Sequence, residues 1–235
     1  MTHRPRGFGQ PARPIRFLLL VLLLVAGTLA AAQRPDPLAR LIAKLRHQQA
    51  VVPSWTAQLK VDIDVPGMHV KGKRVDLRFT APDSFAFETR GFALLPRRAF
   101  MWTVDSLFAG LSNPRILAGQ PGDPRGSIHV RGVFREEGLL ARMDYRVDTL
   151  RWVVTRVSAW HDTVEVVRLD NDWFQAARGV WLPSAVRMRM SFSAESQRFY
   201  ERMRGTLRRR ESAREGTGTI TMTFEKHKLG GRRTP

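Results

Sequence analysis

The residues that could bind a metal or transfer protons are few and widely separated. Six histidines occur, at positions 3, 47, 69, 129, 161 and 227, and no two of them are four residues apart. Zinc hydrolases commonly use that spacing, as in the H-E-x-x-H motif. The sequence contains no cysteine and no G-x-S-x-G segment, so neither a thiol nor a nucleophile elbow is available. These observations predict no catalytic residue, no metal site, no cofactor and no enzymatic activity.

Three acidic segments are the remaining candidates for chemistry. Asp62 and Asp64 fall on the polar side of an alternating segment, where solvation is the expected state. Residues 170–172 (Asp-Asn-Asp) are interpreted as a hairpin turn, which could bind calcium weakly but needs no ion. His161-Asp162 is interpreted as another turn. None of the three forms the constellation that a catalytic site requires.

A strict alternation of apolar and polar residues runs from Trp55 to Val65, with every odd position apolar. This period of two predicts a β-strand with one face on an apolar interior and the other in water. Pro66-Gly67 predicts a turn, and alternation resumes over residues 72–79 and 85–87. This stretch predicts the beginning of a one-sided antiparallel sheet.

Further strand patterns recur at close spacing toward the C-terminus. They cover residues 128–130, 139–148, 150–159, 164–166, 173–181, 186–192 and 219–225, and a change of phase near Thr155 predicts a bulge. Residues 91–126 are the least regular, with a short helix expected over 105–111 and a turn-rich loop from Asn113-Pro114 to Pro124. That segment is either a mobile flap or an ordinary surface connection. The expected fold class is mainly β: a curved antiparallel sheet of nine or ten strands that forms an incomplete barrel.

One amphipathic helix precedes the strands. Asp36 and Pro37 provide an N-cap and a first-turn proline, and the helix is expected to end before Pro53. Its apolar residues recur at helical spacing and are expected to cover the concave face of the sheet: Leu38, Leu41, Ile42 and Leu45.

The first 32 residues have the features of a signal peptide. Four arginines without any acidic residue precede an apolar run from Phe17 to Val25, and three alanines end at Ala32. The apolar part is shorter than the roughly 20 residues that a spanning helix needs, although an uncleaved anchor is the alternative. We therefore expect residues 1–32 to direct export to the periplasm and residues 33–235 to form a single domain.

The chain is strongly basic, with a net charge of +18, of which the four arginines of the signal segment contribute four. Such a charge favours anionic partners, for example membrane headgroups, whereas export argues against nucleic acid. Residues 193–215 form a basic insertion, either an amphipathic helix or a flexible hairpin extension. The alternative is that the arginines simply solvate the outer face of the sheet.

The predicted inner face is rich in aromatic residues and methionine rather than in aliphatic residues alone. This mixture can repack around ligands of varied shape. In addition, a single helix is small relative to the apolar face of so many strands. We therefore expect a ligand cavity, with a dry packed core as the alternative. The candidate ligand-binding residues are Trp55, Leu59, Val61, Leu77, Phe79, Phe85, Phe87, Met143, Tyr145, Trp152, Met188, Met190 and Met222.

The order of these features resembles one protein family. After the signal segment come the Leu/Arg helix, Ser54-Trp55-Thr56-Ala57-Gln58-Leu59, and Ala81-Pro82-Asp83-Ser84-Phe85, and a Gly-x-Trp-x-Pro segment follows at residues 179–183. In this order they resemble the periplasmic lipoprotein-carrier and sorting proteins of the LolA/LolB-like superfamily. The good match covers roughly residues 36–90 and the late segment.

The resemblance implies an incomplete barrel with helices as a lid, whose apolar interior holds the acyl chains of lipoproteins or other lipids. The implied protein is a monomer that needs no cofactor. In the carriers an arginine directly before the proline of the second turn bonds to the lid, whereas this sequence has Ala81 there. A scaffold for another lipid fits this departure as well. A non-catalytic module of the cell envelope, docking on an anionic membrane or partner through its basic face, is the alternative function.

Overall fold

The structure is a computed structural model that describes residues 36–88, 103–136, 139–196 and 215–230. The expected signal segment and most of the basic insertion lie outside these residues. Ser193 and Ser196, at the start of the insertion, each donate a backbone N–H to the other's hydroxyl oxygen, at 2.7 and 3.2 Å. This reciprocal pattern is the one found at helix N-termini. No helix among the described residues is long and apolar enough to span a bilayer.

The N-terminal helix α2 (Pro37–Ala50) begins and packs as its sequence predicts. The Asp36 carboxylate accepts a hydrogen bond from the Leu38 N–H at 3.1 Å, and Pro37 occupies the first turn, where a missing N–H costs nothing. Leu41 and Leu45 are buried in the same core as the inner residues of the sheet. The helix therefore covers part of the apolar face.

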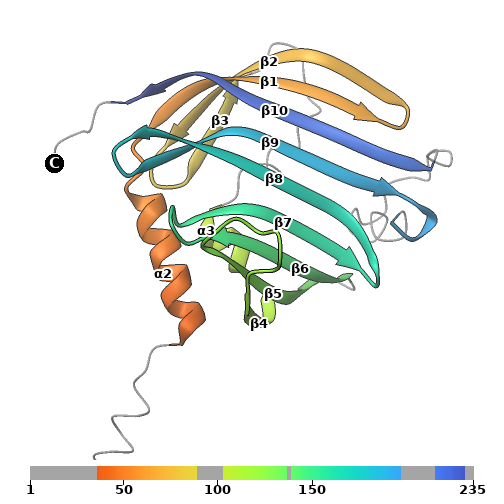
Figure 1. Ribbon diagram of the computed structural model, residues 1–235. Helices are drawn as coiled ribbons and strands as arrows, with labels where there is room; N and C mark the ends of the chain where they lie inside the picture. Colours follow the sequence, from red (N-terminus) through yellow and green to blue (C-terminus); the bar gives the residue numbers. More distant parts are fainter. Residues whose placement is uncertain (1–35, 89–102, 137–138, 197–214, 231–235) are drawn as a thin grey trace, which may run out of the picture.

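Ten strands form one antiparallel sheet in the described part of the chain (Figure 1). The first three follow the predicted alternation closely: β1 (Trp55–Val65), β2 (Met68–Thr80) and β3 (Ser84–Glu88). Gly67, with a φ of +82°, makes the tight turn between β1 and β2. The remaining strands are β4 (Leu111–Ala118), β5 (Ser127–Glu136), β6 (Leu139–Asp148), β7 (Val153–His161), β8 (Val164–Ala177), β9 (Val180–Phe192) and β10 (Gly216–Leu229).

The strand order is β3-β2-β1-β10-β9-β8-β7-β6-β5-β4. The first and last strands pair near the middle of the sheet, whereas β3 and β4, consecutive in the chain, form its two edges. The sheet curves strongly but its edges do not pair, and α2 and α3 (Val104–Phe108) lie beside it (Figure 1). The predicted fold class, a mainly β protein with an open, incomplete barrel, is confirmed.

The segment expected to be a turn-rich loop contains an edge strand instead. Helix α3 ends at Phe108 rather than at residue 111, and Asn113-Pro114 lies within β4. Asn113 has a φ of +49°, and the pairing of β4 with β5 shifts between Ser112 and Arg115. Proline is tolerated here because an edge strand has one unpaired side and the bulge removes the need for its N–H.

The second correction concerns Asp170-Asn171-Asp172, which lies in the middle of β8 and is not a turn. The hairpin between β8 and β9 turns instead at Arg178-Gly179, where Gly179 has a φ of +74°. Turn-forming residues persist in this strand because Arg156 and Arg187, on the two neighbouring strands, stand directly opposite Asp170. By contrast, His161 ends β7 next to the turn predicted at that position, and the bulge predicted near Thr155 is present.

Candidate functional site

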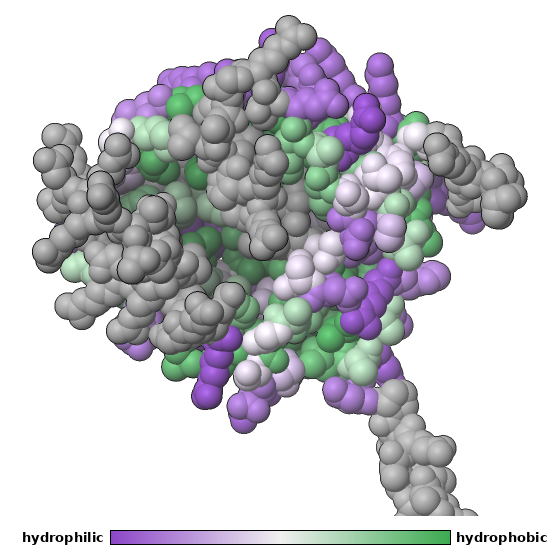
Figure 2. Space-filling model, turned by 180° about the vertical axis from the view of Figure 1, so that it is seen from behind, coloured by the Kyte–Doolittle hydropathy of each residue, from purple (hydrophilic) through white to green (hydrophobic). Residues whose placement is uncertain are grey.

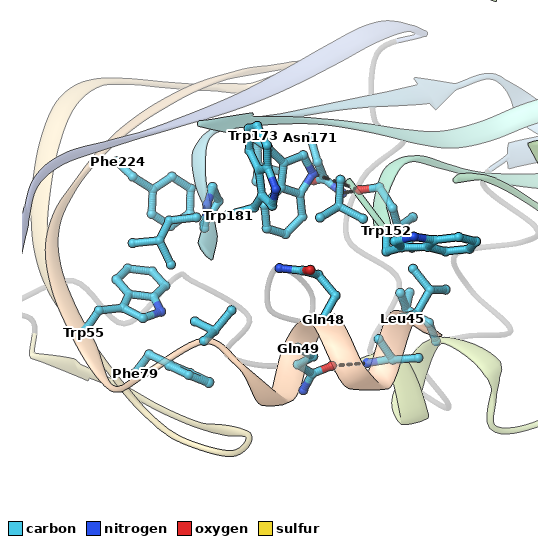
Figure 3. A pocket seen from close by; sticks show the side chains of 18 of the residues that line it. Leu45, Gln48, Gln49, Trp55, Phe79, Trp152, Asn171, Trp173, Trp181 and Phe224 are labelled. Atoms are coloured by element: carbon cyan, nitrogen blue, oxygen red, sulfur yellow. Dashed lines mark hydrogen bonds between the residues drawn. The ribbon is translucent and has the colours of Figure 1, made fainter. Parts of the chain in front are cut away.

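An apolar cavity of about 160 Å³ lies between α2 and the inner face of the sheet. Hydrophobic residues gather in the hollow of the face seen in Figure 2, and hydrophilic residues surround it along the rim. The cavity is lined mainly by aromatic and aliphatic side chains, and among the described residues Gln48, Gln49 and Asn171 contribute amide groups (Figure 3). Its chemistry is therefore suited to an uncharged, apolar ligand.

One wall of the cavity is aromatic because three strands place their rings in line. Trp55 pairs with Phe79, and Phe79 pairs with Phe85, across β1, β2 and β3. The ring centroids lie 5.9 Å apart for the first pair and 4.8 Å for the second. Phe224 of β10 continues this wall, with its ring centroid 6.3 Å from that of Trp55 (Figure 3).

His227 extends the same wall as a neutral ring. Its centroid lies 5.7 Å from that of Trp55 and 4.7 Å from that of Phe174, and Nε2 lies 3.0 Å from the carbonyl oxygen of Pro183. Burial lowers the pKa of His227 and outweighs the opposite effect of that hydrogen bond. A neutral imidazole that donates from Nε2 to the carbonyl explains this arrangement.

The opposite wall contains three tryptophans, two of which have a cation over the ring at the rim of the cavity. The indole Nε1–H of Trp173 donates to the Val154 carbonyl at 3.1 Å, which satisfies its only polar group. Lys44 Nζ lies 4.3 Å from the ring centroid of Trp152, and the Arg151 guanidinium lies 5.0 Å from that of Trp181. These cation–π contacts place positive charge beside the cavity and not inside it.

Helix α2 is held over the cavity by its glutamines. Gln48 Nε2–H donates to the Gly179 carbonyl at 2.8 Å, and the Val104 N–H donates to Gln49 Oε1 at 2.8 Å. Gln49 Nε2–H also donates to the carbonyl of Pro82 at 3.4 Å. The helix therefore bonds to the β8–β9 turn, to α3 and to the β2–β3 turn, which contains Ala81.

The structure brings some of the predicted site residues to the cavity and buries others elsewhere. Trp55, Phe79, Phe85, Trp152 and the helix residue Leu45 line it. The other candidates lie in the core away from the cavity, either fully buried (Leu59, Val61, Leu77, Tyr145, Met188, Met222 and the helix residue Leu41) or partly buried against it (Phe87, Met143, Met190, Leu38 and Ile42).

Several lining residues were not among the candidates derived from the sequence. Phe224 alternates in β10 like the chosen residues, whereas Trp173 and Trp181 lie on either side of the β8–β9 turn. The face on which Trp173 and Trp181 lie could not be predicted from alternation. The pairing of β8 with β9 shifts register at Asp172/Trp173 and again at Gln175/Ala177. No sequence feature identified Gln48 and Gln49 as lining residues, because glutamine is common near the end of an amphipathic helix.

Two further features concern possible chemistry outside the lining of the cavity. Burial raises the pKa of Tyr145 well above its usual value, and its hydroxyl donates to the Leu107 carbonyl at 2.8 Å. Tyr145 is therefore a neutral structural donor. Within residues 36–88, 103–136, 139–196 and 215–230, no group of three or more metal-ligating side chains comes together.

Comparison with solved structures relates this fold to proteins that share almost no sequence identity with it. A structure described as an outer membrane lipoprotein-sorting protein domain, from Vibrio parahaemolyticus, superposes with a TM-score of 0.51 at 8% identity. The match covers 82% of this chain and 92% of that one. A LolA superfamily protein from Nitrosomonas europaea gives a TM-score of 0.48 at 8% identity, covering 84% of this chain and 94% of that one.

The first of these likenesses confirms, for the fold, the resemblance expected from the sequence. No family model matches the sequence, and the comparison with curated proteins found no match. The fold is therefore similar to that of the Vibrio parahaemolyticus domain, at an identity that carries no information on the ligand.

Proposed function

We propose that this chain is an exported, periplasmic lipid-binding protein that holds part of an acyl chain in the cavity beneath α2, with a role in carrying or sorting lipoproteins. The observation that carries this proposal is the cavity itself: aromatic and aliphatic walls, no charged side chain among the described residues that line it, and a covering helix. The fold shared with a lipoprotein-sorting domain supports it. The proposal assigns the chain no catalytic step and needs no cofactor.

The size of the cavity sets how much of a lipid it can hold. A dry cavity of about 150 Å³ in another protein accommodates benzene, a ring of six carbons. A cavity of about 160 Å³ therefore holds a segment of about six carbons. At about 0.8 kcal/mol per buried methylene, such a segment contributes about 5 kcal/mol to binding. A longer acyl chain requires α2 to move away from the sheet, so the length of chain bound and the position of the helix are coupled.

Uptake of a fluorescent fatty acid by delipidated protein tests this proposal. Phe85→Asp places a carboxylate at the cavity wall, and because Phe85 is only partly buried on an edge strand, the fold should tolerate the change. We expect affinity to fall at least tenfold, since an unpaired charge disfavours an apolar ligand.

Ile116→Asp is the matched control, because Ile116 is a half-exposed apolar residue on the other edge strand, β4, and does not line the cavity. It should change affinity less than twofold. Equal affinity in wild type and Phe85→Asp would refute binding in this cavity.

A further inference from the structure

A polar groove crosses the outer face of the sheet, on the side opposite the apolar cavity. It has a volume of about 500 Å³, and its lining residues come from β6, β7, β8, β9 and β10. Its charged lining consists of the guanidinium groups of Arg146, Arg156, Arg187 and Arg189 and the carboxylates of Asp170 and Asp172. It shares only Asn171 with the apolar cavity.

The register of the sheet places like charges directly opposite one another here. Arg146 pairs with Arg156 across β6 and β7, and Arg168 pairs with Arg189 across β8 and β9. Side chains at directly opposed positions begin only about 5 Å apart, so like charges at such positions are unfavourable. The first pair lines the groove, whereas Arg168 lies outside its lining and donates to Glu165 at 2.8 Å. A bound anion would therefore relieve chiefly the repulsion between Arg146 and Arg156.

Nearby carboxylates offset this repulsion only in part. Asp170 accepts hydrogen bonds from Arg156 at 2.6 Å and from Arg189 at 3.3 Å. Asp172 accepts one from Arg187 at 2.6 Å, and Asp123, outside the groove, lies 3.4 Å from Arg146. Three carboxylates thus face four guanidinium groups, which leaves an excess positive charge.

The arginines also retain hydrogen-bond donors. A guanidinium group carries five N–H donors, and the contacts with other described residues use one donor each on Arg156, Arg187 and Arg189 and two on Arg146. The side chains of Arg187 and Arg189 are each 52% exposed, so their remaining donors are open to the groove. The planar fork of arginine matches the oxygens of a phosphate group in a bidentate manner.

We propose that this arginine groove binds a phosphate-bearing group, with Arg187 and Arg189 donating to its oxygens and Arg146 and Arg156 compensating its charge. The volume exceeds that of a single phosphate and leaves space for the organic part of a headgroup-sized ligand. This proposal assigns a specific phosphate-binding site to the basic face that was expected from the sequence. The groove is independent of the acyl cavity, so either proposal can fail without the other.

Calorimetric titration of the full chain with inorganic pyrophosphate at low salt tests the groove. Wild type should bind, and the double variant R187Q/R189Q should bind at least tenfold more weakly. Both residues are half-exposed, so the fold should persist; the single variant R189Q, expected to bind at least threefold more weakly, provides a second measurement. R74Q/R78Q is the matched control, since it removes the same charge from exposed positions of β2 outside the groove, and its affinity should stay within twofold of wild type.

Absence of pyrophosphate binding by wild type at millimolar concentration, or equal weakening by the two double variants, would overturn the proposal. Flotation with vesicles then distinguishes the source of the phosphate. Binding to phosphatidylglycerol vesicles but not to phosphatidylcholine vesicles, lost in R187Q/R189Q and kept in R74Q/R78Q, assigns the groove to a lipid headgroup. Pyrophosphate binding without vesicle binding assigns it to a soluble phosphate compound.

Discussion

The two faces of the same ten-stranded sheet differ in almost every physical respect. The inner face buries tryptophan, phenylalanine and aliphatic residues around a cavity whose described lining residues are all uncharged, whereas the outer face carries a groove in which arginines outnumber carboxylates. Both arise from one sequence rule, because successive residues of a strand point to opposite faces. The comparison shows how one set of strands can carry two unrelated binding surfaces.

The two faces should also respond differently to conditions. Burial of apolar surface on the inner face depends little on salt, whereas exposed charges are screened within about 8 Å at physiological ionic strength. Measurements that separate packing from charge therefore sharpen the contrast between the faces.

The largest expected effect comes from the inner face. Leu45 is 1% exposed, lines the cavity from α2 and packs into the main core. Leu45→Ala should lower the free energy of unfolding by about 2–5 kcal/mol, with little dependence on salt. Denaturant unfolding measures this change. Leu150→Ala is the control, because Leu150 is 71% exposed, and it should shift stability by less than about 0.5 kcal/mol. A similar small effect at Leu45 would mean that α2 does not pack on the sheet.

An intermediate effect is expected from the polar contacts that hold α2 in place. The double variant Gln48→Ala/Gln49→Ala removes the bonds to Gly179, Val104 and Pro82. At about 1 kcal/mol per hydrogen bond, loss of these three bonds should lower the free energy of unfolding by about 3 kcal/mol.

If α2 moves to admit a ligand, the same variant should also take up fluorescent fatty acid several-fold faster, as stopped-flow fluorescence would show. A slower or unchanged uptake rate, at reduced stability, would argue against movement of the helix. His47→Ala, an exposed change in the same helical turn, serves as the control.

The smallest expected effect belongs to the outer face and depends on pH. Burial alone would raise the pKa of Asp170, but the hydrogen bonds and charges of Arg156 and Arg189 outweigh it and hold the pKa below its usual value. A depressed folded-state pKa stabilises the protein above the unfolded-state pKa of about 3.9, and this contribution is lost as pH falls through the folded-state value.

Asp170→Asn should therefore flatten the fall in the free energy of unfolding as pH is lowered from about 5 toward 2, and the difference from wild type should shrink in high salt. Asp83→Asn, at an exposed position of the β2–β3 turn, should leave the slope unchanged. Identical slopes for wild type and Asp170→Asn would show that the Asp170 carboxylate does not stabilise the folded protein through its contacts with the arginines of the groove.

Much of the fold could be predicted because local patterns determine it. The alternation from Trp55 to Val65 specified a one-sided strand, and Asp36, Pro37 and the leucine spacing specified the helix that follows. Errors arose where tertiary contacts outweighed local preference: residues 170–172 contain typical turn formers, yet arginines on both neighbouring strands keep them extended. Asn113-Pro114 was interpreted as a loop for the same reason, although an edge strand can absorb it through a bulge.

By itself, the sequence determined which residues of the regular strands, such as β1, face inward, because a period of two requires only the chain's own alternation. Which of those residues surround a space was decided by tertiary structure alone, since Phe85, on the edge strand β3, and Trp152, in the β6–β7 turn, line one cavity only when the sheet curves beneath α2. Tertiary structure likewise determined which arginines line the groove. Each arginine alternates with apolar residues in its own strand like many others, and the register across the four strands β6 to β9 brings these four together.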